Sequence, residues 1–186
     1  MRVRLGGSSA EPDVDGTRAL VVAVADLLPP VRAGLHGLVV THSVDLGDPP
    51  VPHPSASSSA FPVALRPLVT FGGGAVQVTS TGTVDGVAVS TGTITVGTRP
   101  DVGRAQQAVL LLTEIAPPAD RPRRGATLRA PAANGVPDGA DSVASIAFPF
   151  DSVPRGAYVA RLRVDGVEST VTVANDGRIN GPTVTL

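Results

Sequence analysis

The chain has 186 residues, of which 42% are hydrophobic and 17% are charged. This composition supports a folded core and excludes a disordered chain, which would have fewer Val and Leu and a higher net charge. The formal net charge of −1 gives no overall field that would attract nucleic acid or an anionic membrane. The absence of Cys excludes a disulfide framework and a thiolate metal site.

Aromatic residues make up only 3% of the chain, with one Tyr and no Trp. Val, Leu, Ala and Ile must therefore fill the core, which favours thin β-sandwiches over wide folds that enclose a ligand. Gly and Pro are frequent and lie between short apolar runs, which indicates many turns.

The first long apolar run spans Ala19 to Leu28. Glu11, Asp13 and Asp15 precede it, unlike the basic leader of a signal peptide, and the run is too short to cross a bilayer. We therefore predict a buried strand. Residues 13–16 faintly resemble a calcium loop, but the terminal Glu ligand is missing, so we predict a turn there.

Four prolines lie between residues 48 and 54. Because proline cannot donate to a sheet ladder, this segment cannot be a central strand. We predict a long extended loop over residues 48–60, followed by a closing strand from Phe61 to Val69.

Turn signals recur roughly every ten residues, a spacing typical of a β-sandwich. Asp-Gly and Asn-Gly pairs tolerate the positive φ angles of tight hairpin turns. They occur at Asp15-Gly16, Asp85-Gly86, Asn134-Gly135, Asp138-Gly139, Asp165-Gly166, Asp176-Gly177 and Asn180-Gly181.

The clearest predicted hairpin runs from Tyr158 to Val173 and turns at Asp165-Gly166. Its first strand is expected to direct four side chains to the core and three away from it. The inward set is Tyr158, Ala160, Leu162 and Val164, and the outward set is Val159, Arg161 and Arg163.

Two further segments are predicted as strands. Residues 79–96 should form strands of about five residues, broken by Gly82, Gly86 and Gly92. Residues 109–115 could also belong to a helix that starts near residue 105, but the flanking Gly103 and Pro117 leave little length, and we predict a buried strand.

A weak internal repeat relates residues 22–40 to residues 146–164. Aligning Gly34 with Gly156 places His36 on Tyr158, and such repeats usually indicate repeated domains. The predicted fold class is all-β, with two tandem immunoglobulin-like β-sandwich domains over residues 1–70 and 71–186.

The three histidines, His36, His42 and His53, lie close in sequence to Asp45 and Asp48. That spacing could hold a divalent cation, but strand positions three apart face opposite sides, so no metal site is predicted. There is no Gly-x-Ser-x-Gly elbow and no Lys. We expect no catalysis and no cofactor.

Arg121, Arg123 and Arg124, with Arg129 nearby, form the basic cluster of the chain. Arg is favoured at protein interfaces, and the alternative is a solvated loop. Single-stranded nucleic acid is not expected because no aromatic side chains lie between the arginines. Together with Pro52 and His53 in the proline-rich segment, Arg121, Arg123 and Arg124 are the candidate partner contacts.

The N-terminal part resembles an IPT/TIG module, which is an immunoglobulin-like domain. The residues concerned are Arg2 to Gly7, Thr17 to Ala25, Pro30, and the stretch from Gly34 to Val40. This resemblance implies a fold and no particular activity.

Residues 30–186 are similar to the C-terminal region of actinobacterial cap proteins. The matching segments are Val44 to Gly47, Pro52-His53, Phe61 to Pro67, Gly103 to Leu112, Phe148 to Gly166 and Gly181 to Val184. Cap proteins close the end of the tube and sheath in contractile injection systems, which are phage-tail-like machines.

The cap resemblance implies a non-catalytic assembly protein whose partners are subunits of a tube and sheath, with homo-oligomers in the particle as one arrangement. It implies assembly in the cytoplasm and release in an extracellular particle, with no nucleic-acid or membrane partner. The alternative is an extracellular immunoglobulin-like module that binds peptide or glycan. Glycan binding usually needs exposed aromatic platforms, which are scarce here.

Overall fold

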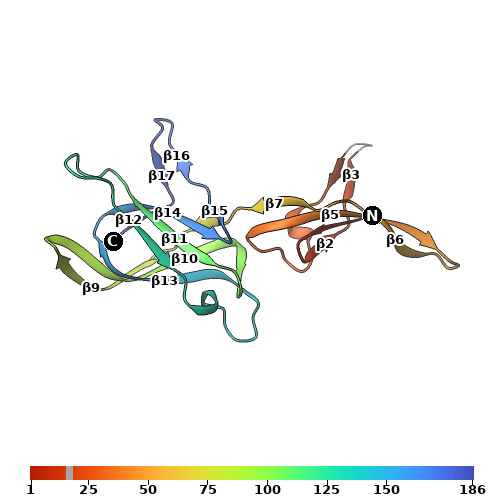
Figure 1. Cartoon of the computed structure of the whole chain (residues 1–186), viewed down its shortest axis with the longest axis horizontal. Helices are drawn as coiled ribbons and strands as arrows, with labels where there is room; N and C mark the ends of the chain where they lie inside the picture. Colours follow the sequence, from red (N-terminus) through yellow and green to blue (C-terminus); the bar gives the residue numbers. More distant parts are fainter. Residues whose placement is uncertain (16–18) are drawn as a thin grey trace. The chain divides into compact units, whose positions relative to one another are not determined.

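A computed structural model describes residues 1–15 and 19–186. The fold is all-β, as predicted, with 60% strand and 4% helix. The chain divides into two compact units, and Figure 1 labels most of their strands. The first unit contains Met1–Val31 and Leu35–Leu65, and the second contains Arg32–Gly34 and Arg66–Leu186.

The division between the units lies at Leu65/Arg66, whereas the sequence placed it after residue 70. The difference arises because β8 (Leu68–Thr70) pairs with β10 (Val87–Gly103) of the second unit. Residues 32–34 also belong there. The Ala33 amide donates to the Asp101 carbonyl at 3.0 Å, and Gln106 Nε2 donates to the Ala33 carbonyl at 2.6 Å.

The first unit is built on a five-stranded antiparallel sheet in the order β2-β1-β5-β6, with β7 also paired to β5. Its strands are β1 (Arg2–Leu5), β2 (Ser8–Ala10), β5 (Gly34–Leu46), β6 (Val51–Ser57) and β7 (Phe61–Leu65). Strands β3 (Asp13–Asp15) and β4 (Ala19–Val21) form a separate antiparallel pair. The core is small and centres on Leu5, Leu27 and Val31.

The predicted sandwich of residues 1–70 stays a prediction, because the described residues give this unit one large sheet and a small core. The predicted buried strand over residues 19–28 is wrong. Strand β4 is three residues long, η1 (Val24–Asp26) follows, and Val21, Val24 and Leu28 are exposed. The turn predicted at residues 13–16 is wrong for residues 13–15, which form strand β3, and Gly16 lies outside the described residues.

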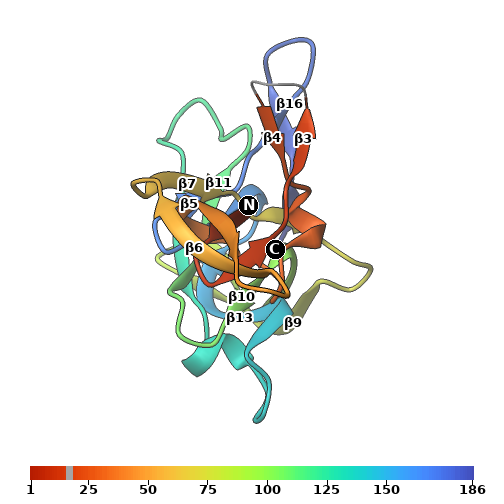
Figure 2. The same ribbon diagram turned by 90° about the vertical axis from the view of Figure 1, so that its right-hand side faces the viewer.

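The second unit packs two antiparallel sheets around one core. One sheet contains β8, β9 (Val76–Val84), β10 and β13 (Ser142–Pro154). The other contains β12 (Gly125–Arg129), β11 (Ala108–Glu114), β14 (Ala157–Val164), β15 (Val167–Glu168) and β18 (Thr183–Thr185). Figure 2 shows β10 and β13, the most extensively paired strands, side by side.

The core of the second unit lies between these sheets and takes side chains from both. Ile94 and Phe148 from the first sheet and Leu110 from the second are fully buried. On β14, all four residues predicted to point inward are also fully buried, namely Tyr158, Ala160, Leu162 and Val164. Val159, predicted to point outward, is buried as well, at 5% exposed.

Two Asp-Gly turns form as predicted. Asp165 (φ 47°) and Gly166 (φ 86°) join β14 to β15, and Asp85 (φ 50°) and Gly86 (φ 76°) join β9 to β10. The final strand of the second sheet is interrupted between β15 and β18 by a small hairpin of β16 (Thr172–Val173) and β17 (Ile179–Gly181). One 3-10 turn, η2 (Ala132–Gly135), precedes β13.

The prediction of short strands over residues 79–96 is wrong, because β9 has 9 residues and β10 has 17. Gly92 does not end β10. It lies at a bulge where a Cβ atom would be 2.0 Å from the Gln77 carbonyl oxygen. Glycine is therefore required by the close approach of β9, and the strand continues through it.

We expect Gly92→Ala to destabilise the protein by about 1–3 kcal/mol, because the β9 backbone must shift to accommodate the methyl group. Gly82→Ala is the matched control, since its Cβ would meet nothing closer than Val89 Cγ2 at 3.9 Å. Urea denaturation measures both. Equal stability losses for the two variants would contradict the close approach at Gly92.

Candidate docking surfaces

The β5–β6 arm, defined here as residues 42–57, continues past the edge of the first unit's sheet. The last pair between β1 and β5 is Arg2–Thr41, and β5 goes on to pair with β6 as far as Leu46–Val51. Every residue of the arm is exposed. Figure 1 shows β6 running out beyond β2 and the N-terminus. A two-stranded hairpin by itself is only marginally stable in water, so packing against a partner would stabilise this arm.

One side of the arm is apolar. Val44 lies opposite His53 and Leu46 lies opposite Val51, and residues two apart on a strand share a side. Val44, Leu46 and Val51 are 48%, 56% and 51% exposed. The other side has Ser43, Asp45, Pro52 and Pro54. The sequence-predicted contacts Pro52 and His53 thus lie on opposite sides of the arm, and His53 borders its apolar side.

The outer edge of β6 is protected by its prolines. Residues 48–60 were predicted to be a loop, but residues 51–57 form an edge strand, a position that tolerates proline. Pro52 and Pro54 lie opposite Asp45 and Ser43 and have no N–H to offer on the open side. Strand addition to β6 is therefore disfavoured, and its apolar side is the better contact surface.

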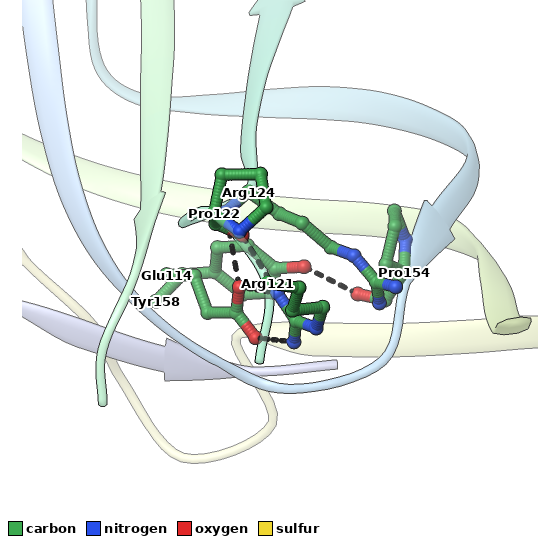
Figure 3. A network of polar contacts seen from close by, with 6 residues as sticks. All are labelled: Glu114, Arg121, Pro122, Arg124, Pro154 and Tyr158. Carbon is green, nitrogen blue, oxygen red and sulfur yellow. Dashed lines mark hydrogen bonds and ion pairs between the residues drawn. The ribbon is translucent and has the colours of Figure 1, made fainter. Parts of the chain in front are cut away.

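A cluster of polar contacts around Glu114 holds the Arg-rich loop after β11 in place (Figure 3). Glu114 is the last residue of β11 and its side chain is 7% exposed. Arg121 donates to both of its carboxylate oxygens, at 2.7 and 2.5 Å. The Arg124 amide donates to Glu114 Oε2 at 3.0 Å, and Arg121 also donates to the Pro122 carbonyl at 3.1 Å. This bidentate ion pair fixes the loop against the sheet.

The ion pair changes the ionisation of Glu114. The hydrogen bond from Arg121, opposed by burial and assisted by the Arg124 amide, lowers the pKa of Glu114 from 4.5 to about 2. The same hydrogen bond raises the pKa of Arg121. Glu114 is therefore a carboxylate throughout the neutral range and is bound to an internal partner.

The three arginines predicted as contacts have different environments. The guanidinium of Arg121 is bound to Glu114, and its side chain is 25% exposed. Arg124 is partly buried. Its amide donates to the Glu114 carboxylate, and its carbonyl accepts from the Glu114 amide. Arg123 is exposed. Of this cluster, Arg123 offers the most accessible charge to a partner.

Tyr158 lies beside this cluster and pairs with Glu114 across β11 and β14. Its ring is fully buried, and its hydroxyl donates to the Pro154 carbonyl at 2.6 Å (Figure 3). Burial raises the pKa of the Tyr158 hydroxyl. The sequence predicted that Tyr158 points into the core, but it did not predict this hydrogen bond. The one local indication of the bond is the position of Pro154, four residues before Tyr158.

The histidines and aspartates considered for a metal do not gather. Within residues 1–15 and 19–186, no three His, Asp or Glu side chains are grouped so that they could hold a metal ion. In the same part of the chain, no helix is long and apolar enough to cross a membrane.

The strand arrangement and these surfaces define an all-β protein whose second unit is a two-sheet sandwich. Residues 69–185 match a protein family described as "Domain of unknown function (DUF8756)". The match covers more than half of the chain, and the protein belongs to this family. No curated protein and no solved structure matches the chain.

Proposed function

We propose that this protein is a non-catalytic docking protein and that its second unit is an immunoglobulin-like sandwich. Strands β8–β9, β10 and β13 on one sheet and β11, β14 and β18 on the other correspond to strands A, B, E and C, F, G of that fold. Tyr158 lies near the start of β14, which corresponds to strand F, and its hydroxyl donates to the backbone four residues upstream, as in the tyrosine corner of immunoglobulin-like domains.

The observation that supports docking most directly is the β5–β6 arm. Its apolar side chains, Val44, Leu46 and Val51, are half exposed on a ribbon that its own unit does not cover. Exposed apolar surface of this kind is typical of protein–protein contacts. In contrast, the buried carboxylate of Glu114 is bound to Arg121, an arrangement that holds a loop and leaves no free acid or base there.

The particular assembly we propose is a contractile injection system of the phage-tail-like kind, in which this chain is a cap component or an accessory of the cap. Its partners would be protein subunits of the tube and sheath, assembled in the cytoplasm and released with the particle. The proposal rests on the sequence resemblance of residues 30–186 to cap proteins, and the projecting arm suits a subunit that inserts between neighbours.

The test is purification of contractile particles from the producing cells, with and without the gene for this chain. We expect the chain in the purified particles, and we expect deletion of the gene to change tube and sheath lengths. Particles that lack the chain, or deletion particles of unchanged length, would rule out the cap assignment.

One observation favours an extracellular peptide-binding module as a second candidate. The Gly6 amide donates to the Gly37 carbonyl, and the Ser58 amide donates to the Val40 carbonyl. Odd-numbered residues of β5 therefore direct their backbone groups toward the side of β1, and Ser43 and Asp45 lie beyond the end of β1. An extended peptide could add there. Two results together would favour this candidate: saturable binding of a peptide or glycan on an array, and absence of this chain from purified contractile particles.

A further inference from the structure

Strand β9 forms an unusually unprotected sheet edge in the second unit. It has nine residues, Val76–Val84, and pairs only with β10 among the strands that the structure describes. From Gln77 to Val84 every residue is exposed. The sequence of β9 contains no proline and no charged residue, the two features by which proteins most often prevent edge-to-edge pairing.

Of the other edge strands in the described part of the second unit, β8 has only three residues, and the longer ones carry proline or charge. Strand β13 contains Pro149 and Pro154, and β12 ends on Arg129. The β15–β18 edge is short and is interrupted by the β16–β17 hairpin. Among the described edge strands of the second unit that are longer than three residues, β9 alone has neither proline nor charge.

The backbone of β9 is oriented to accept another strand. The Ala88 carbonyl accepts a hydrogen bond from the Arg155 amide, so the backbone groups of Ala88 point toward β13 and away from β9. Thr83 lies opposite Ala88, and its backbone groups therefore point to the open side. By the two-residue alternation of a strand, those of Thr81 do the same.

The side chains of β9 are arranged to match a second copy of the same strand. Residues 78–84 read Val-Thr-Ser-Thr-Gly-Thr-Val and are nearly symmetric about Thr81. In an antiparallel pair centred on Thr81, Ser80 lies opposite Gly82, and a bulge at Thr79, between the Ser80–Thr91 and Val78–Gly92 pairs, shifts the register beyond Ser80. Val78 and Val84 are 45% and 49% exposed at the two ends of this segment, where a second copy would cover them. Pairing of Thr and Val side chains across strands is favourable, and no like charges meet.

We propose that two copies of this chain pair through their β9 strands, antiparallel and about a two-fold axis at Thr81, so that their β10-containing sheets join into one continuous sheet. The contact is isologous and closed, because each copy contributes the same strand. This association needs no other partner, and it stands or falls separately from the proposed role in an injection particle.

Single-cysteine variants test the pairing and its register, because the natural chain has no Cys. Cα atoms of directly opposite, hydrogen-bonded residues are about 5.5 Å apart, within the range a disulfide spans. We expect Thr81→Cys chains to form disulfide-linked dimers under mild oxidation. Thr83→Cys chains should not, because the Cα atoms of the two substituted residues would be about 14 Å apart.

Sedimentation equilibrium of the full chain provides the second measurement. We expect a concentration-dependent dimer, and Thr81→Lys should weaken it about tenfold by placing two like charges opposite each other. Thr172→Lys makes the same change on the exposed strand β16 and should leave the dimer unchanged. A chain that stays monomeric up to about 1 mM, or equal crosslinking of Thr81→Cys and Thr83→Cys, would overturn the proposal.

Discussion

Replacement of Tyr158 by alanine is expected to destabilise the protein by about 3–5 kcal/mol, the usual cost of removing a large buried aromatic side chain. Tyr158 is fully buried and lies in the same core as Phe148 and Leu162. Alanine would leave a cavity between the two sheets and would also leave the Pro154 carbonyl without its hydroxyl donor. Since whole domains are stable by about 5–15 kcal/mol, the second unit should lose much of its stability.

Urea denaturation followed by far-ultraviolet circular dichroism measures this effect. Tyr158→Phe is the control, because it keeps the ring and removes only the hydrogen bond to Pro154, with an expected loss of about 1 kcal/mol. An alanine variant no less stable than the phenylalanine variant would contradict the account of this core.

Replacement of Glu114 by glutamine is expected to lower the thermal midpoint markedly at pH 7 and much less near pH 2. The pKa of Glu114 is lowered from 4.5 to about 2 in the folded protein, so the folded state binds fewer protons than the unfolded state. The ion pair therefore contributes its full stability above pH 4.5, and this contribution is lost as the pH falls from 4.5 to about 2.

Thermal unfolding of the natural chain and the variant across this pH range tests the linkage. The difference between the two curves should shrink as the pH falls. Glu168→Gln is the matched control. Glu168 pairs with Arg161 at 3.1 Å, both side chains are partly exposed, and such a pair contributes little to stability. A difference for Glu114→Gln that is constant from pH 7 to pH 2 would mean that the Arg121 pair does not stabilise the fold.

The sequence predicted the second unit better than the first for a physical reason. On β14, the alternation of inward and outward residues and the Asp-Gly turn both involve residues close together in sequence, so both can be recognised locally. The length of β10 could not be predicted in this way. A glycine inside a strand pattern usually indicates a break, but Gly92 allows the close approach of Gln77. The apolar run after residue 19 led to the wrong prediction of a buried strand, because most of its side chains are exposed beside a small core.

The candidate contacts stay a prediction, but the structure shows local arrangements that the sequence did not indicate. Pro52 and His53 were proposed from a proline-rich composition, which does not distinguish a loop from an edge strand. The partner of Arg121 was missed because Glu114 belongs to an apolar strand, and the bidentate contact depends on how the loop returns to the end of that strand. Nothing local in the sequence encodes that return.

The most direct test of the docking role compares two charge insertions on opposite sides of the arm. Leu46→Asp alters the apolar side, and Ser43→Asp alters the polar side. Both positions are exposed, so neither change should affect folding. The measurement is cosedimentation of each purified protein with particles assembled in its absence.

We expect the natural chain and Ser43→Asp to bind the particles, and Leu46→Asp to bind at least about tenfold more weakly. Unchanged binding by Leu46→Asp, or no binding by the natural chain, would contradict the arm's role as the docking surface.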